Sequence, residues 1–404
     1  MTKIIFSTIG KPNCGKTTFL NSACLTDAKV GDFPFTTIDA NKGVAYVKKK
    51  CVCKELNVKD NPKNSVCIEG YRFIPINLLD VAGLVPDAHK GKGLGNKFLS
   101  DLSRADVLLH ILDITGALDK SGRKVSIGFS DPYEDIVFLE NEINLWFKEI
   151  LEREDWNRFI KIHSRDKKKF IEALHSRLSG MKIKKNHIIT AIKKSDLDKK
   201  YPADWSEENL LLFTKNLREL SKPILIVANK IDKEISLKNL ESLEKSYKGQ
   251  IIPCSALAEH VLKNYHEDKK IHYIPGSTDF QIVEQNKLNS REIETLKKIK
   301  KSILDVFNGT GVQNALNYAA FKIANLISVY PVADLKKFSD KSNNILPDVF
   351  LVKKGTLLRD FVRKKIHSDL AKHFIYGIDA RTNRKLGENY ELKDNDVIKI
   401  VSAK

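Results

Sequence analysis

Short apolar runs recur along much of the chain, and segments with helical spacing separate them. The clearest runs lie at residues 4–9, 78–81, 107–112, 223–228 and 251–252. Their continuous apolar character is typical of strands buried on both faces, as in a parallel sheet that helices cover. The pattern predicts an α/β fold whose central sheet is doubly wound and mostly parallel.

Helical spacing dominates the segment between the third and fourth of these runs. Its first apolar stripe advances in steps of three and four residues, as an amphipathic helix requires: Ile136, Leu139, Ile143, Trp146 and Ile150. A second stripe indicates another helix or a helical pair: Phe159, Ile162, Phe170, Leu174 and Leu178. We expect residues 130–221 to form an inserted α-helical domain, a hairpin with partly coiled-coil character.

The pattern changes again beyond residue 327. We expect a strand at 347–352, then a helix that Thr356 caps and that reaches about Leu370. A turn then leads into a closing strand within 391–401. Two strands, a helix and further strands within about eighty residues favour a small β-grasp unit. The first part of the α/β domain, the insertion, the second part of the α/β domain and the β-grasp unit are expected at 1–129, 130–221, 222–327 and 328–404.

The loop after the first apolar run fits the phosphate-binding pattern of two glycines followed by a lysine and a hydroxyl residue. It reads GKPNCGKT and leads into a helical segment at 17–23. Its glycines let consecutive N–H groups converge on an anion at a helix N-terminus. Lys16 would reach the β- and γ-phosphates, and the Thr17 hydroxyl would ligate Mg²⁺. The residues expected to contact nucleotide here are Gly10, Lys11, Pro12, Asn13, Cys14, Gly15, Lys16, Thr17 and Thr18.

Three later segments predict the rest of a guanine nucleotide site, namely the contacts to Mg²⁺, to the γ-phosphate and to the base. Asp80, at the end of an apolar strand, can hold a Mg²⁺-bound water, and Gly83 can bring its N–H to the γ-phosphate. In the NKID segment, Asp232 offers two acceptor oxygens to the N1–H and 2-amino donors of guanine, which adenine lacks. Asn229 and Lys230 would support the base from the side. The turn expected to contact guanine O6 through backbone N–H groups comprises Ser255, Ala256 and Leu257.

Four elements in this order and spacing resemble the motif set of GTPases, and more narrowly the YchF-type branch of the Obg-like GTPases in its archaeal form. FPFTT at 33–37 resembles the first switch of that group, and DVAGL at 80–84 with the glycine-rich segment at 90–96 resembles the second. The resemblance covers nearly the whole chain. It implies a P-loop GTPase domain, Mg²⁺ as cofactor and a C-terminal TGS domain.

The resemblance also implies which nucleotide is bound and which threonine acts. Many YchF-type proteins lack the guanine-reading NKxD and accept ATP, whereas NKID is intact here, so GTP and its product GDP are the expected ligands. Thr36 or Thr37 of the first switch should meet Mg²⁺ and the γ-phosphate, and Thr37 is the one we favour. With Lys16 and Gly83, Thr37 completes the expected catalytic set.

Two residues bear on the rate of hydrolysis. The position after DxxG holds Leu84, where many GTPases have a glutamine that orients the attacking water. Hydrophobic-substituted GTPases share this replacement, so intrinsic hydrolysis should be slow. Asn13 matches an asparagine that coordinates K⁺ in potassium-stimulated relatives, but it could equally only shape the loop. His89 and His110 are potential helpers, and His110 is more simply explained as a core residue; neither receives a catalytic role.

The composition indicates a globular protein of the cytoplasm. Hydrophobic residues make up 42% of the chain, no apolar run reaches membrane-spanning length, and the first strand leaves no room for a signal peptide. We expect a monomer. Three of the six cysteines, Cys51, Cys53 and Cys67, share one polar loop with Asp60. They could hold a zinc ion, or they could be ordinary reduced thiols on a hairpin insertion.

Charge points to a polyanionic partner. The net charge is +18, and between Arg158 and Lys200 there are 14 Lys and Arg against four Asp and Glu, a local balance of +10. Such a field favours phosphate backbones, although charged helices often only solvate their outer faces. We expect the insertion and the basic TGS domain to engage a ribosomal subunit or structured RNA. The alternative is an RNA-binding module in which nucleotide is mainly a ligand and hydrolysis is incidental.

Overall fold

The structure is a computed structural model, and it describes residues 4–24, 42–84, 101–152, 155–366 and 372–403. The first switch with Thr36 and Thr37, and the part of the second switch that includes His89 and residues 90–96, lie outside the described residues. The expectations placed on those residues therefore stay predictions.

The centre of the molecule is a seven-stranded sheet in the order β2-β4-β1-β5-β6-β7, with β3 also paired to β4. Its parallel strands are β1 Ile5–Ile9, β4 Tyr71–Asp80, β5 Val107–Asp113, β6 Ile224–Asn229 and β7 Ile251–Cys254. The two antiparallel strands, β2 Lys42–Lys50 and β3 Val66–Ile68, pair with β4 at one edge. The predicted mostly parallel sheet is confirmed.

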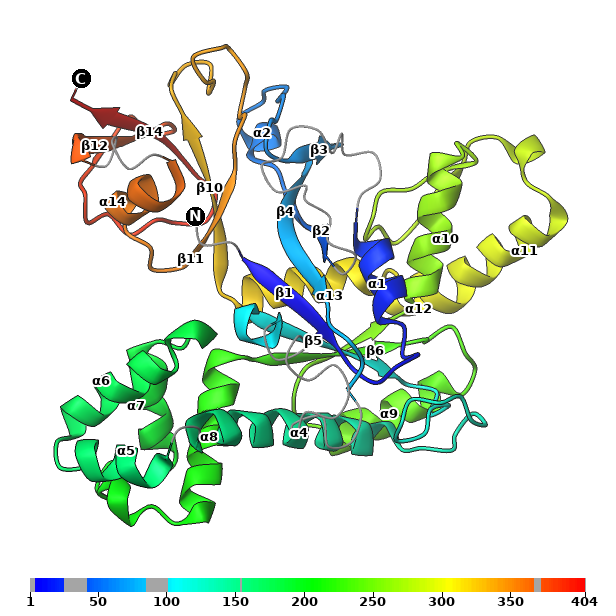
Figure 1. Ribbon diagram of the computed structural model, residues 1–404. Helices are drawn as coiled ribbons and strands as arrows, with labels where there is room; N and C mark the ends of the chain where they lie inside the picture. The colour runs from blue at the N-terminus through cyan, green and yellow to red at the C-terminus, as the bar shows by residue number, and fades with distance from the viewer. Residues whose placement is uncertain (1–3, 25–41, 85–100, 153–154, 367–371, 404) are drawn as a thin grey trace.

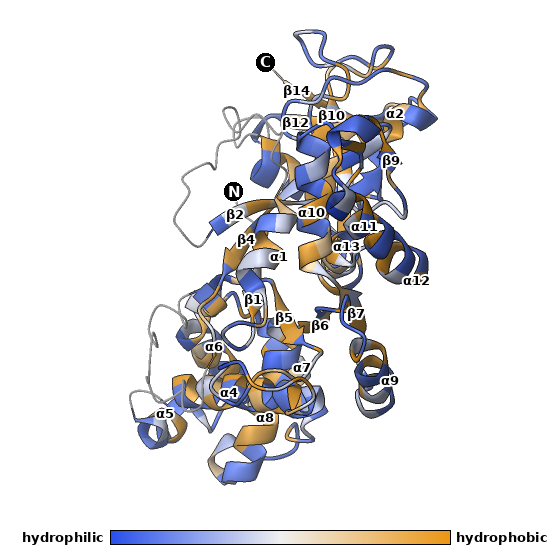
Figure 2. Ribbon diagram, turned by 90° about the vertical axis from the view of Figure 1, so that its right-hand side faces the viewer, coloured by the Kyte–Doolittle hydropathy of each residue, from blue (hydrophilic) through white to orange (hydrophobic). Residues whose placement is uncertain are grey.

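Helices cover both faces of this sheet (Figure 1). The helices of one face are α1 Lys16–Ala23, α10 Ala256–Glu267 and α13 Val312–Tyr318, and those of the other are α4 Pro132–Glu152, α8 Glu207–Ser221 and α9 Ser236–Ser246. Every residue of β5 is buried, and its side chains alternate between the two cores: Leu109 packs in the cluster of α1 and α13, whereas Leu108 packs with Leu139 of α4. The hydropathy colouring accordingly shows β5 as largely hydrophobic (Figure 2).

The insertion between β5 and β6 is a compact helical unit and not the hairpin expected from the sequence. Its described α-helices are α4, α5 Trp156–His163, α6 Lys167–Arg177, α7 Lys185–Lys194 and α8. The helices are separated by breaks in the chain. At the start of α6, for example, the Asp166 carboxylate accepts from the N–H groups of Lys168 and Lys169. Ile162, assigned to the apolar stripe, is 61% exposed. A single long hairpin would have required an uninterrupted stripe.

Aromatic rings fill the interior of this unit. Phe170 is fully buried, and its ring centroid lies 6.1 Å from that of Phe159 and 5.6 Å from that of Trp205. Trp205 in turn lies 5.1 Å from Phe213 of α8. Such ring pairs add to the free energy gained by burial. The tryptophans that the sequence places in the insertion therefore belong mainly to its core.

The C-terminal region is a second, five-stranded sheet in the order β11-β10-β14-β12-β13. Its strands are β10 Leu326–Val332, β11 Phe350–Lys353, β12 Phe374–Asp379, β13 Lys385–Leu386 and β14 Asp396–Ser402. The helix α14 Leu358–Phe361 continues as a π-helical turn to Ile366. The cap expected of Thr356 is wrong, because its hydroxyl donates to the Lys353 carbonyl and Leu357 occupies the cap position. β10 already begins at Leu326, and the four domain limits remain predictions.

The remaining described α-helices and strands are short or lie outside the two large sheets. They are α2 Val52–Glu55, β8 Ile271–His272, β9 Gln281–Ile282, α11 Ser290–Ile299 and α12 Asp305–Phe307. Among the residues that the structure describes, no helix is both long enough and apolar enough to cross a bilayer.

Replacing Phe170 with alanine should lower the free energy of unfolding of the insertion by about 3–5 kcal/mol, since a large buried ring is removed and a cavity remains. Tryptophan fluorescence during urea unfolding reports on this unit directly, because all three tryptophans (146, 156 and 205) lie in it. Ile162→Ala is the matched control and should change the free energy by no more than about 0.5 kcal/mol. Equal effects of the two variants would contradict the assigned core.

Candidate functional site

The phosphate-binding loop joins β1 to α1 in the conformation that its glycines allow. Gly10 and Gly15 have φ angles of 142° and 102°, which L side chains rarely adopt. A Cβ on Gly15 would also lie 2.3 Å from the Asn229 side-chain nitrogen. Gly15 occupies the position before α1, so the first free N–H groups of the helix face the loop. Thr18 lies half-buried in the first turn of α1.

The Lys16 ammonium is held inside this loop. Its Nζ donates to the carbonyl oxygens of Gly10 at 3.1 Å and Lys11 at 2.8 Å, and the residue is 8% exposed. Cys14 beneath it is buried, and burial raises the pKa of its thiol to about 11, so the thiol stays neutral. The positive charge of Lys16 is therefore available to a phosphate without a neighbouring thiolate to neutralise it.

Oxygen donors suited to Mg²⁺ meet next to the lysine. The Thr17 hydroxyl donates to Asp80 Oδ2 at 2.7 Å, and the Thr8 hydroxyl donates to Asp80 Oδ1 at 3.0 Å. Thr8 and Asp80 are register partners on the parallel strands β1 and β4, which explains their contact. A hydroxyl and a carboxylate oxygen this close fit a hard cation, so Thr17 and Asp80 would hold the ion.

The segment after Asp80 passes against the phosphate loop. A Cβ on Gly83 would lie 2.7 Å from Pro12 N, so only glycine permits this approach. The Leu84 N–H donates to the Gly10 carbonyl at 3.1 Å, and the Leu84 side chain is 2% exposed within the core formed with Val81. Leu84 therefore packs in this core.

His110 is a core residue. It lies on β5 with 2% exposure, and burial lowers the pKa of its imidazole to about 3. A neutral imidazole inside the sheet is not placed to exchange protons with a nucleotide at the ends of the strands. The structure thus agrees with the sequence-based interpretation of His110 as a core residue.

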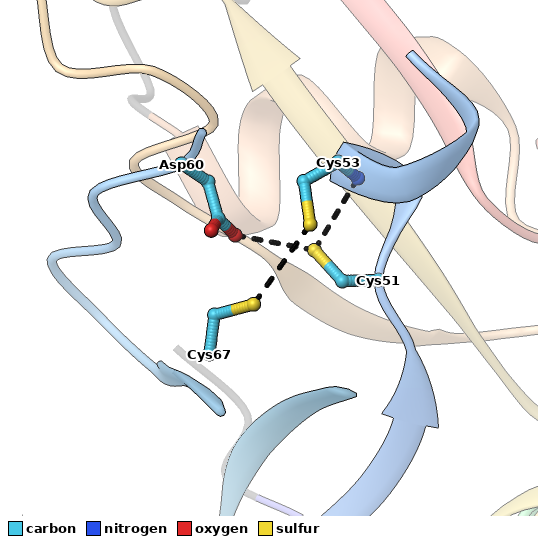
Figure 3. Close-up of side chains that lie close together, drawn as sticks. All are labelled: Cys51, Cys53, Asp60 and Cys67. Carbon is cyan, nitrogen blue, oxygen red and sulfur yellow. Dashed lines mark hydrogen bonds between the residues drawn. The ribbon is translucent and has the colours of Figure 1, made fainter. Parts of the chain in front are cut away.

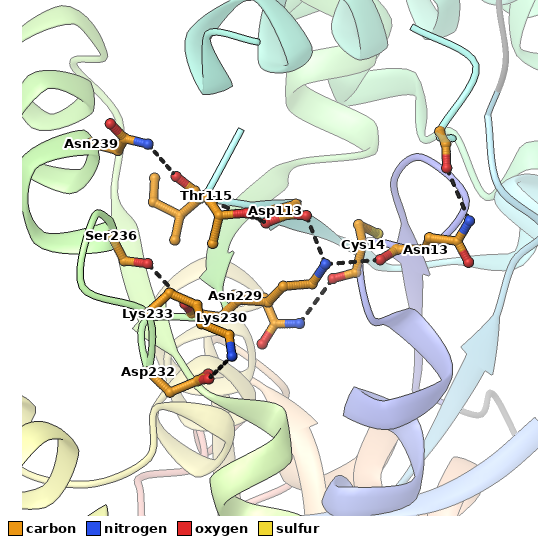
Figure 4. Close-up of polar contacts among 12 residues, drawn as sticks. Asn13, Cys14, Asp113, Thr115, Asn229, Lys230, Asp232, Lys233, Ser236 and Asn239 are labelled. Carbon is orange, nitrogen blue, oxygen red and sulfur yellow. Dashed lines mark hydrogen bonds and ion pairs between the residues drawn. The ribbon is translucent and has the colours of Figure 1, made fainter. Parts of the chain in front are cut away.

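The guanine-reading segment is tied directly to the phosphate loop (Figure 4). The Asn229 amide donates to the Cys14 carbonyl at 2.9 Å and accepts from the Ala256 N–H at 3.1 Å. Asn229 is the last residue of β6, next to the loop that follows β1 across β5. One side chain thus joins the phosphate loop, the NKID segment and the start of α10.

Lys230 forms a second tie. Its Nζ lies 2.7 Å from Asp113 Oδ2 and donates to the Asn13 carbonyl at 3.1 Å. The other Asp113 oxygen accepts from the Thr115 N–H at 3.1 Å and hydroxyl at 2.6 Å. Sequence reasoning missed Asp113, although an acid at the end of a buried strand, like Asp80, was an available signal.

The Asp232 carboxylate is oriented by the turn after β7. Its Oδ1 accepts from the Ser255 hydroxyl at 2.9 Å, and its side chain is 20% exposed. The same Ser255 oxygen accepts from the Ala258 N–H and so caps α10. Leu257, expected in the base contact, is 55% exposed. The geometry leaves Asp232 accessible to a base while fixing its direction.

Two residues of the loop make contacts that the sequence did not reveal. Asn13, with φ 63°, donates from Nδ2 to the Gly122 carbonyl at 3.0 Å, so it joins the loop to the segment after β5. Lys11 is 5% exposed and pairs with Asp135 of α4. Burial raises the pKa of the Asp135 carboxyl, and the Lys11 charge opposes that rise. The first helix of the insertion therefore contacts the phosphate loop itself.

Three family models match successive parts of the chain. A 50S ribosome-binding GTPase model matches residues 6–141, and an Obg-like GTPase YGR210-like, G4 motif-containing domain matches residues 227–334. A TGS domain model matches residues 342–402. The matches follow the order in which the phosphate loop, the guanine-reading segment and the C-terminal sheet occur.

Several relatives extend over most of the chain. A GTP-binding protein of Methanocaldococcus jannaschii is 45% identical over 98% of both sequences. One of Schizosaccharomyces pombe is 34% identical over 87% of this chain and 88% of its own length. Obg-like ATPase 1 of Homo sapiens is 26% identical over 98% of this chain and 92% of its own length.

Solved structures show the same architecture. A GTP-binding protein from Pyrococcus horikoshii OT3 has a TM-score of 0.77 at 37% identity and covers 99% of this chain and 100% of its own. The YchF GTPase of Schizosaccharomyces pombe has a TM-score of 0.58 at 17% identity, with 99% and 98% covered, which shows likeness of fold. With its P-loop GTPase domain, helical region and C-terminal TGS domain, the chain belongs to the Obg-like family of GTPases, in the YchF group, and is a GTP-binding protein.

Proposed function

We propose that the protein is a cytoplasmic switch that hydrolyses GTP to GDP and phosphate and acts on the ribosome or on structured RNA. The observation that carries the nucleotide assignment is the orientation of Asp232 by Ser255. A carboxylate with two acceptor oxygens suits guanine, and adenine would leave it unpaired. Obg-like ATPase 1, at 26% identity, bears an ATPase name, so the choice of GTP for this chain rests on its own NKID segment.

Hydrolysis would depend on positioning and charge. Lys16 would pair with the β- and γ-phosphates, and Thr17 and Asp80 would hold Mg²⁺, which neutralises charge on the phosphates when bound. Thr37 would add a further ligand from the first switch, and the Gly83 N–H would meet the γ-phosphate. Because Leu84 is buried, no side chain at that position orients water, which favours slow intrinsic turnover.

Potassium would supply the missing stabilisation. The Asn13 amide uses its nitrogen toward Gly122, so its oxygen remains a candidate ligand for K⁺ beside the phosphates. A monovalent cation at that point would act electrostatically, as an arginine finger does in other GTPases.

The basic face of the insertion is the proposed RNA contact. Lys167, Lys168 and Lys169 at the start of α6 are exposed, whereas Phe170 of the same helix is fully buried in the core of the unit. The local balance of +10 over residues 158–200 would attract phosphate backbones, and such contacts carry little sequence information. The buried Leu84 keeps the second candidate open, a ribosome- or RNA-binding module in which hydrolysis is incidental.

Asp232→Asn should weaken GTP binding by about tenfold or more, since an unmatched polar group costs about 1–3 kcal/mol, and should admit xanthine nucleotide, whose 2-oxo group needs a donor. Isothermal titration with GTP, XTP and ATP measures both effects. Glu234→Gln, an exposed acid two residues on, is the matched control. Equal affinity of the parent protein for ATP and GTP would refute the base assignment.

GTP turnover should rise when K⁺ replaces Na⁺, because Asn13 matches the asparagine that coordinates K⁺ in potassium-stimulated relatives, and Asn13→Ala should abolish the difference. Phosphate release under single-turnover conditions checks this in both salts. Asn21→Ala, on the far turn of α1, controls for loss of an amide. The same rate in both salts for the parent would leave Asn13 with only its contact to Gly122.

Reversing Lys167, Lys168 and Lys169 to glutamate should reduce affinity for ribosomal subunits or structured RNA. A plot of the logarithm of RNA affinity against the logarithm of salt concentration should become less steep. The slope should fall in magnitude by about 0.7–0.9 for every phosphate that these lysines no longer neutralise. GTP affinity should be unchanged. Reversal of three exposed lysines elsewhere, Lys297, Lys298 and Lys301, gives the same change in charge and serves as control. If both variants cosediment with ribosomes as well as the parent does, the proposed RNA contact is wrong. The assignment of GTP binding would not be affected by that result.

A further inference from the structure

A cluster of sulfur and oxygen donors lies outside the nucleotide site, where β2 and β3 are joined (Figure 3). Cys51 follows β2 at the cap position of α2, Cys53 lies in α2, and Cys67 lies in β3. Asp60 comes from the loop between α2 and β3. One donor atom from each of the four residues lies within 4.8 Å of every other. Chain segments up to 16 positions apart are thus folded so that their metal-binding atoms meet.

The separations agree with a tetrahedral site. Zn–S bonds of about 2.3 Å and Zn–O bonds of about 2.0 Å require S···S edges near 3.8 Å and S···O edges near 3.5 Å. The Cys53 and Cys67 sulfurs are 3.9 Å apart, and the Cys51 sulfur lies 3.2 Å from Asp60 Oδ2. Only small shifts of the chain would be needed for an ion to bind between these four donor atoms.

The surroundings of the cluster also suit a bound cation. Cys51 and Cys53 are buried, and the Asp60 side chain is 8% exposed. The Cys53 N–H donates to the Cys51 sulfur at 3.5 Å, and Arg72 lies 2.8 Å from Asp60 Oδ2. Supporting contacts of this kind orient the ligands of metal sites. Three thiolates and a carboxylate beside one guanidinium would leave negative charge buried, which a divalent ion offsets.

A disulfide explains the cluster less well. Cys53 and Cys67 are free, and their sulfurs are well beyond the bonded distance of about 2.05 Å. A bond between them would leave unexplained why Cys51 and Asp60 also place donor atoms within 4.8 Å of both sulfurs. We propose that Cys51, Cys53, Asp60 and Cys67 bind a single zinc ion, whose preference for tetrahedral sulfur-rich sites matches this donor set.

The loop that supplies Asp60 also carries the contact with the C-terminal region. The Asn61 N–H donates to the Ile345 carbonyl at 3.0 Å, and the Lys63 N–H donates to the Pro347 carbonyl at 2.7 Å. Asn64 exchanges two hydrogen bonds with the Val349 backbone, at 2.9 and 3.0 Å. An ion that fixes Asp60 would therefore hold the surface on which residues 338–349 rest.

Arg72 connects the cluster to the same junction. It is fully buried, and besides its pair with Asp60 it donates to the Leu346 carbonyl at 3.0 Å. Its guanidinium also lies 5.5 Å from the Tyr330 ring centroid, within reach of a cation–π interaction. These contacts give the GTPase and TGS regions a common polar junction, in addition to the apolar cluster that they share. The zinc would act as a structural staple between the two regions.

Metal analysis of the full chain, purified under reducing conditions without a chelator, tests the proposal. We expect one zinc ion per chain by mass spectrometry, and its loss in Cys53→Ser combined with Cys67→Ser. Cys24→Ser, which removes a partly exposed thiol outside the cluster, is the control and should keep the metal. Hydrogen exchange in residues 338–349 should become faster when the zinc is removed, whereas exchange in β1 and β5 should not.

A second measurement keeps the test decisive if the double variant does not fold. The parent, stripped of metal and reloaded with Co²⁺, should show thiolate-to-cobalt charge-transfer absorption, and Asp60→Cys should strengthen it by adding a fourth sulfur ligand. A folded, reduced parent that fails to hold zinc against the dye 4-(2-pyridylazo)resorcinol would overturn the proposal. So would a Cys53–Cys67 disulfide in the metal-free native protein, or zinc retained by the folded double variant.

Discussion

The side-chain amide of Asn229 holds the parts of the nucleotide site in one arrangement. It binds the phosphate loop at Cys14 and the start of α10 at Ala256, while its backbone ends β6. The amide offers a donor and an acceptor on one rigid plane, so it can satisfy two backbone groups that come from opposite directions. Gly15 makes this possible, since any Cβ there would occupy the place of the amide nitrogen. The phosphate loop and the NKID segment are therefore joined by one shared contact.

Ion pairs that are at least partly buried extend this arrangement to the neighbouring elements. Lys230 pairs with Asp113 at the end of β5, and Lys11 pairs with Asp135 on α4. An ion pair taken out of water holds its geometry only if further hydrogen bonds satisfy it, and Thr115 provides these for Asp113. The pair on α4 joins the phosphate loop to the insertion. The helical unit therefore contacts the nucleotide site directly through α4, although the basic surface of the unit lies outside that site.

Local chemistry was enough for the sequence by itself to determine the glycine loop after β1, the strand that leads into NKID and the mostly parallel sheet. Gly10, Gly15 and Lys16 lie within one short segment, the NKID residues lie within another, and the buried strands are continuous apolar runs. The positions of Thr17 and Asp80 also followed, because parallel strands bring their carboxyl ends to one edge. The expected hairpin and the Thr356 cap were wrong, since helix ends depend on which polar groups the packed structure leaves to be satisfied.

Only the tertiary structure decided which distant residues meet. Asp113 ends an apolar run and Asp135 looked like an ordinary acid, but neither partner could be read from the sequence. Their pairing with Lys230 and Lys11 depends on how β5 and α4 pack beside the loop. The three cysteines and Asp60 had uninformative spacing, because a C-x-C pair does not by itself form a metal site. The turn of α2 and the return of β3 brought their donor atoms together. Contacts between segments far apart in the chain have no local signature, so the sequence supplied these side chains and the fold determined their partners.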